Sequence, residues 1–390
     1  MAAAGGAAEW AYADLRSQPQ PVQGPSGVIQ ISPSGDPTGV TDTARINAAL
    51  SKYPVVQMLP GTLAEGAVPA IHPWYVNAPI IVPPGTRLTG GWYWQAVDSD
   101  DYSAGPLATG GVLIIAVKGF HGASVIAMVN DTGGQQGAQV IEGITIEGDA
   151  LPAGSGIHGI LIRGAVGAGF IQGVTVHRPD GDCLHAVTDS GTGLVPDSWQ
   201  VSFSKFSASR SGRGVYLAEL PDSWFVACES SENQGDNWYC AFGTNTRFLG
   251  CKGENSKAGN GWHFGGLFEG QVIELTGCTS QLNAGNGFLF DDSAGRDLGT
   301  YALAGCRSWR DGRSRAKPSA GFAVEGCQSR VIGTGCVTSP DSAGSAYGAS
   351  HVGGAYGTCF TGAYLAGTVA PVLDDGTGRN SLIHQSPVPF

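Results

Sequence analysis

The chain has 390 residues, of which 42% are hydrophobic, so it is long enough for one large repeat domain or two ordinary domains. Its formal net charge of −11 argues against binding along the backbone of a nucleic acid. The 62 glycines and 22 prolines accompany this high apolar content, which favours turns between short strands over a flexible linker.

The N-terminal segment is polar and contains Pro and Gly, which predicts an arm over residues 1–34 that could dock on a partner. Its first stretch, "MAAAGGAAEWAYADLRSQ", lacks the basic start and the long apolar core of a secretion signal. The chain also has no run of about 18 apolar residues. We therefore expect neither a signal peptide nor a membrane span.

The next segments carry a family resemblance. These are "GDPTGVTDTARINAAL" (35–50), "VVQMLPGTL" (55–63), "VNAPIIVPPGTRLTGGW" (76–92) and "IEGITIEGD" (141–149). They resemble the entry of the pectate-lyase-like superfamily of parallel β-helices. The resemblance implies a short capping helix at about Thr43–Ser51, then a strand ending in Leu-Pro-Gly-Thr, then the first coils of a right-handed solenoid.

A short motif then recurs along the chain, as in "SKAGNGWHF" (256–264) and "LNAGNGFLF" (282–290). Its copies align on one Gly, Asn or Asp residue each: Gly159, Asp182, Gly214, Asn237, Gly261, Gly287, Gly321 and Gly348. We interpret this residue as a left-handed turn that precedes a short alternating strand. The steps of 23–34 residues leave no room for helical crossovers. The pattern therefore predicts an all-β, single-stranded parallel β-helix, in which each coil buries its apolar row against the next.

A column of cysteines precedes the turns, one to a coil. Its members are Cys228, Cys251, Cys278, Cys306 and Cys336. Because they repeat once a coil, we expect them to point into one core as small buried side chains, without disulfides. No Cys-x-x-Cys pair is present, which argues against a zinc site.

Towards the C-terminus, the basic stretch "RSWRDGRSRAK" (307–317) predicts a surface loop that could touch an anionic partner. The β-helix domain is expected to cover residues 35–370, followed by a C-terminal tail over 371–390.

The alternating strands predict which side chains face outward. Val215 and Leu217 are expected in the core and Tyr216 outside. The same register gives one outer row of Leu161, Leu184, Tyr216, Tyr239, His263 and Leu289, and places His185 inside as a core histidine. Outward aromatic rings on successive coils suit the faces of sugar rings. This predicts substrate binding by Tyr216, Tyr239 and His263 with Arg213; the alternative is a subunit contact that buries the row.

Carboxylates gather near the same turns, and the candidate catalytic residues are Asp180, Asp182, Glu219 and Asp236. Asp182 and Asp236 are expected on coils two apart, roughly 9–10 Å from each other. A carboxylate pair separated by about 6.5–9.5 Å suits an inverting glycoside hydrolase. A lyase would instead use carboxylates to hold Ca²⁺, with a basic group to abstract a proton. No other metal or cofactor is expected. The alternative is that these residues only cap turns.

The superfamily includes pectin-active lyases, polygalacturonase-like hydrolases and bacteriophage tailspikes. This chain lacks the Asn-Thr-Asp and Gly-His-Gly motifs of the hydrolases and the Trp-Ile-Asp-His motif of the lyases. It therefore resembles the tailspikes best. This implies a virion-tail protein, expected as a homotrimer, that binds a bacterial cell-surface polysaccharide, with depolymerisation of that polymer as a further activity to test. Its arm would dock on other tail or baseplate proteins. The alternatives are a bacterial polysaccharide lyase or glycoside hydrolase, and a non-catalytic structural or adhesion module.

Overall fold

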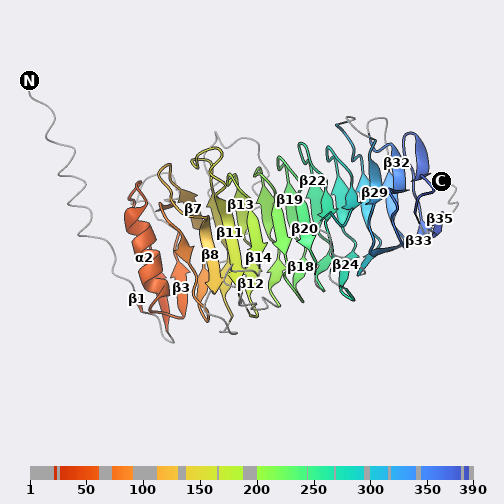
Figure 1. Cartoon of the computed structure of the whole chain (residues 1–390). Coiled ribbons are helices and arrows are strands. Elements are labelled where there is room, and N and C mark those ends of the chain that lie inside the picture. The colour runs from red at the N-terminus through yellow and green to blue at the C-terminus, as the bar shows by residue number, and fades with distance from the viewer. Residues whose placement is uncertain are drawn as a thin grey trace, which may run out of the picture.

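The computed structural model describes residues 22–23, 27–60, 73–90, 112–130, 138–164, 167–187, 200–243, 245–267, 269–293, 299–314, 318–339, 344–378 and 382–385. Within them, short strands recur in a fixed order, and the coils that they form stack along one axis (Figure 1). Each strand pairs in parallel with its counterpart in the next coil, apart from an antiparallel start. The predicted right-handed parallel β-helix is confirmed.

The strands form three sheets. Sheet A runs in the order β1 (Val22–Gln23), β2 (Val28–Ile31), β3 (Val55–Met58), β6 (Arg87–Thr89), β9 (Val140–Glu142), β12 (Phe170–Gln172), β15 (Ser202–Ser204), β18 (Trp224–Val226), β21 (Arg247–Leu249), β24 (Val272–Thr276), β27 (Thr300–Ala304), β30 (Arg330–Thr334), β33 (Thr358–Ala363) and β35 (Leu382–Gln385). Sheet B consists of β4 (Trp74–Val76), β7 (Val112–Ala116), β10 (Ile144–Glu147), β13 (Thr175–His177), β16 (Ser207–Ser209), β19 (Glu229–Ser231), β22 (Lys252–Glu254), β25 (Thr279–Gln281), β28 (Arg307–Trp309) and β31 (Val337–Ser339). Sheet C consists of β5 (Ile80–Ile81), β8 (Ser124–Asn130), β11 (His158–Gly164), β14 (Leu184–Val187), β17 (Val215–Ala218), β20 (Trp238–Phe242), β23 (Trp262–Phe264), β26 (Phe288–Phe290), β29 (Ala320–Glu325), β32 (Tyr347–Val352) and β34 (Ala370–Asp374).

Both ends of the solenoid extend past their predicted limits. The capping helix α2 (Val40–Leu50) starts before Thr43, and its buried Ile46 and Leu50 face the core. Strand β2 lies within the predicted arm 1–34 and already pairs with β3; residues 1–21 and 24–26 lie outside the described residues. At the other end β34 and β35 continue the sheets beyond residue 370, where a tail was expected. The described residues include no helix with the length and apolar character that a membrane span requires.

Stacked aromatic rings fill the core. Trp238 and Trp262 lie parallel with ring centres 4.8 Å apart, and Phe288 continues the stack 5.8 Å from Trp262. Phe225 and Phe248 form a second stack, at 5.0 Å, that meets the indoles edge-on. Because the coils are in register, each inward ring meets its neighbour's ring one coil away.

The cysteine column is a ladder of free, buried thiols, as predicted. Cys251, Cys278 and Cys306 each donate a hydrogen bond to a carbonyl of the preceding coil, at 3.3–3.5 Å. Directly before each of these thiols is a glycine in the left-handed region, with φ near 61° at Gly250 and Gly277.

The glycines of the repeated motif do not form the left-handed turns that the sequence predicted. None of the aligned glycines, Gly214 and Gly261 among them, has a positive φ. At both positions a Cβ would collide with a buried serine hydroxyl, of Ser230 and Ser280 respectively. Gly is needed at these two positions because the serine of the next coil leaves no room for a Cβ.

Candidate functional site

An outward row of side chains crosses sheet C. Strand pairing aligns Leu161, His185, Tyr216, Tyr239, His263 and Leu289, one to a coil. The rings of His185 and Tyr216 stack with centres 4.6 Å apart, Tyr216 meets Tyr239 edge-on at 5.6 Å, and Tyr239 lies 4.5 Å from His263. We call these six residues the outer row. The predicted outward rings of Tyr216, Tyr239 and His263 are half-buried, and the ring of His185 extends this series to four consecutive coils.

One member of the row was predicted wrongly. Leu184 was expected outside and His185 inside, but Leu184 is fully buried and pairs with Val215 of the core. The turn before β14 spans residues 178–183, one residue longer than the turn at 210–214 before β17. Since a slip of one residue exchanges the two faces of a strand, the extra residue reverses the assignment.

A second column lies at the corner between sheets B and C, three residues before each member of the outer row. It contains His158, Asp182, Arg213, Asp236, Asn260 and Asn286. We call it the turn column. Asp182 and Asp236 are thus on coils two apart with Arg213 between them, as the sequence predicted. Both columns lie on the same edge of sheet C, so their polar groups can act together.

Asp182 is buried, and its carboxylate makes three contacts with two side chains. Arg213 donates to its carboxylate from Nε at 2.8 Å and from Nη2 at 3.1 Å, and His185 Nδ1 lies 2.7 Å from Oδ2. Burial would raise the pKa of Asp182, but these hydrogen bonds and the Arg213 charge outweigh it and hold the pKa below its ordinary value. An ionised carboxylate can only accept, so the neutral form of His185 carries its proton on Nδ1 and presents the Nε2 lone pair.

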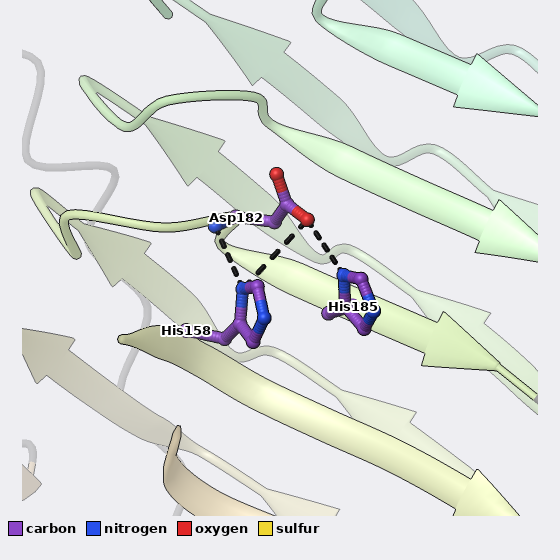
Figure 2. A group of neighbouring side chains, drawn as sticks. All are labelled: His158, Asp182 and His185. Carbon is purple, nitrogen blue, oxygen red and sulfur yellow. Dashed lines mark hydrogen bonds and ion pairs between the residues drawn. The ribbon is translucent and has the colours of Figure 1, made fainter. Parts of the chain in front are cut away.

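His158 completes this cluster, as Figure 2 shows, with its ring stacked on His185 at 4.1 Å. The backbone N–H of Asp182 donates to His158 Nδ1 at 3.0 Å, so the remaining proton of the neutral ring is on Nε2. Burial and then the neighbouring His185 and Arg213 lower the pKa of His158 to about 4. This imidazole is therefore uncharged at neutral pH.

His263 lies between two carboxylates from different coils. Its Nδ1 is 2.8 Å from Asp236 and its Nε2 is 3.0 Å from Asp291, which follows β26. Burial alone would lower the pKa of His263, but hydrogen bonds and charge from both carboxylates raise it to about 9. At neutral pH both ring nitrogens donate, and the imidazolium ties three consecutive coils together.

This clamp predicts a pH-dependent stability. The imidazole titrates near 6.5 when unfolded and at about 9 when folded. A group whose pKa is higher in the folded protein than in the unfolded chain stabilises the folded state fully at pH values below the unfolded pKa. This stabilisation is lost as the pH rises through the folded-state pKa. We expect the free energy of unfolding to fall on the order of 3 kcal/mol across this window. Denaturant titrations of the wild type and His263→Gln should show a flatter profile for the variant; parallel profiles would contradict the clamp.

Three groups that can ligate a metal, His158, Asp182 and His185, meet with their ligand atoms within 4.8 Å of one another (Figure 2). Their geometry does not fit an ion. The imidazole planes differ by only 17°, so their lone pairs run side by side and do not converge. His158 Nδ1 already accepts a backbone proton, and Arg213 occupies the carboxylate. Ca²⁺ takes about six to eight oxygen ligands, and the Ca²⁺ expected for a lyase stays a prediction.

Two predicted catalytic residues lie apart from this cluster. Asp180 accepts from the backbone N–H groups of Gly154 at 2.9 Å and Gly156 at 2.6 Å, so it caps a turn. Glu219 follows β17, at the opposite end of the strand from Arg213, roughly 20 Å along the strand direction from the Asp182 level. The geometry brings together Asp182, Arg213, Tyr216, Asp236, Tyr239 and His263.

Sequence reasoning missed His158, His185 and Asp291. A signal for two of them exists: polar residues recur three positions before each outer-row member, as in Asp182 with His185 and Arg213 with Tyr216. Asp291 carries no such spacing, because it reaches His263 from the far end of its strand.

The chain matches no protein-family model and none of the curated proteins. It is similar to the A-module of the mannuronan C-5 epimerase AlgE4 of Azotobacter vinelandii, with a TM-score of 0.58 at 13% identity over 88% of this chain and 95% of that one. For the gp42 tailspike of Acinetobacter phage vb_AbaP_AS12 the TM-score is 0.56 at 12% identity. The match covers 94% of this chain and 64% of the tailspike chain. For a DFA-IIIase of Arthrobacter chlorophenolicus A6 the TM-score is 0.55 at 12% identity, and the match covers 90% of each chain. These similarities show that the chain has the right-handed parallel β-helix fold.

Proposed function

We propose that this protein binds a bacterial cell-surface polysaccharide along the outer row. The observation that carries the proposal is the series of outward rings on consecutive coils, His185, Tyr216, Tyr239 and His263. Rings on successive coils are repeated at the strand spacing of about 4.8 Å, which gives an extended polymer several equivalent contacts. The guanidinium of Arg213, 4.4 Å from the centre of Tyr216, adds hydrogen-bond donors beside the rings.

The proposal includes a tailspike-like role on a virion tail. Its support is the likeness of fold to the phage tailspike, together with the mannuronan epimerase, whose name refers to a polysaccharide. A homotrimer and an arm, residues 1–34, that docks on tail or baseplate proteins belong to the same proposal.

Cleavage of the bound polymer is the second candidate, and one specific observation favours it. Asp182 is buried, ionised and bonded to His185 Nδ1, so it fixes the tautomer that presents Nε2 as a base. Among the described residues His185 Nε2 has no hydrogen-bond partner. His185 would abstract a proton from the sugar in a lyase or activate water in a hydrolase, with Asp182 as its positioning residue.

The paired-carboxylate hypothesis is less well supported. Asp236 accepts from Asn260 at 2.7 and 2.9 Å and from His263, and Asp182 is held by Arg213. The lowered pKa of Asp182 also makes it a poor proton donor. An inverting hydrolase needs one carboxyl group that keeps its proton.

The proposal is tested by measuring binding to capsule and cell-wall polysaccharides with affinity electrophoresis. We expect Tyr216→Ala to weaken binding about tenfold, because it removes one ring and the surface on which Arg213 rests. Trp224→Ala, which removes a 43% exposed ring from sheet A, is the matched control and should bind normally. Unchanged binding in Tyr216→Ala would refute the site. A change of oligomeric state in that variant would instead make the outer row a subunit contact.

A further inference from the structure

A second exposed feature lies on β28 and the loop that follows it. The stretch 307–317 contains five of the 21 Lys and Arg residues, and the structure describes it as far as residue 314. Arg307 and Arg313 are exposed, and the guanidinium carbons of Arg307 and Arg310 lie 5.8 and 5.3 Å from the centre of the Trp309 ring. We call Arg307, Trp309, Arg310 and Arg313 the basic patch.

Two arginines of the basic patch, Arg307 and Arg313, differ from many other cations of the solenoid. Six of those form ion pairs with carboxylates: Arg87, Arg178, Arg210, Arg213, Arg247 and Lys252. Within the described part of the chain, neither Arg307 nor Arg313 forms one. The acidic residue between them, Asp311, is fully buried. Its carboxylate accepts hydrogen bonds from the side chains of Asn283 and Ser308. A chain with 32 acidic and 21 basic residues thus presents a local positive charge here.

The basic patch continues the corner that carries the turn column. Gly312 N–H donates to the carbonyls of Asn283 at 2.9 Å and Gly285 at 2.7 Å, so the loop packs directly on the coil of Asn286. That coil packs in turn on Asn260, whose Oδ1 accepts from the Asn286 N–H at 2.8 Å. The patch is therefore two coil steps from the coil of His263, with the coil of Asn286 between them, or about 10 Å at the usual strand spacing. A polymer that extends from the outer row across this corner would reach the patch.

We infer that the basic patch binds the negatively charged groups of the polymer, and that the substrate class is an anionic polysaccharide. This inference rests on the proposed function. Guanidinium groups bind carboxylate or sulfate through paired, charge-assisted hydrogen bonds, and Trp309 offers a ring face beside them. Arg213 keeps further N–H donors beside the rings, but its charge is already paired with Asp182, so it is less suited than the patch to bind an anionic group.

Affinity electrophoresis in gels of alginate or polygalacturonate, and of the same polymers after reduction of their carboxyl groups, tests the inference. The wild type should bind the native polymers more tightly than the reduced ones. The double variant Arg307→Gln/Arg313→Gln should lose about five- to tenfold in affinity for the native polymers and little for the reduced ones. Lys118→Gln/Arg330→Gln removes two exposed cations from other parts of the solenoid and should bind like the wild type.

The outcomes separate the two proposals. If the wild type binds native and reduced polymers equally and the double variant matches it, the inference is wrong while the proposed function stands. If the wild type binds neither these polymers nor the capsule and cell-wall polysaccharides, the proposed function fails and the inference with it. Tighter retention by double-stranded DNA than by the anionic polymers, lost in the double variant, would assign the patch to nucleic acid and overturn the inference.

Discussion

Replacing His185 with Phe is expected to lower polysaccharide cleavage by about 10²- to 10⁴-fold while leaving polysaccharide binding close to the wild-type value. Phe keeps a flat ring between His158 and Tyr216, so the stacking on both sides survives. It removes the Nε2 lone pair that Asp182 orients. Asp182 remains ionised and paired with Arg213, so the fold around the site is retained.

Cleavage is measured by the release of reducing ends and by the absorbance of unsaturated uronic products, and binding by affinity electrophoresis. His121→Phe, the same exchange at an exposed histidine near the N-terminal end of the solenoid, serves as the control and should retain full activity. Wild-type turnover by His185→Phe would place the base elsewhere. An equal loss of binding and cleavage would mean that the ring only holds the polymer.

The fold was predictable because each coil carries the same short sequence pattern. Each copy of the motif supplies an inward pair such as Trp262 and Phe264, and no copy can bury that pair alone. The thiol column was predictable for the same reason. What the local pattern could not separate was the reason for each glycine: a left-handed turn at Gly250 and a lack of space at Gly261 look alike in sequence.

The candidate site was predictable only in part, because its contacts join different coils. The outer row needs the register alone, so Tyr216, Tyr239 and His263 were placed correctly. The pairing of Asp182 with Arg213 spans 31 residues, and no spacing in the sequence announces it. The single extra residue before β14 also hid His185, since a turn length cannot be known before the register is seen.

Trp262→Ala is expected to lower the free energy of unfolding by about 3–5 kcal/mol. The indole is fully buried, stacked between Trp238 and Phe288, and its Nε1–H donates to the carbonyl of Thr279 at 3.2 Å. The coils are locked by strand pairing on both sides, so the surroundings cannot collapse into the cavity, and the loss should be near the upper end of this range. Denaturant titration measures this loss. Leu249→Ala, at a side chain that is 48% exposed, is the control and should change the free energy of unfolding by less than about 0.5 kcal/mol.

The Trp262→Ala variant should also affect the pH dependence of stability. Because His263 follows Trp262 directly, the variant should release the clamp between Asp236 and Asp291 and remove the pH dependence described above. A variant that loses stability but keeps that pH dependence would show that the polar outer row is held by its own hydrogen bonds and not by the core beneath it.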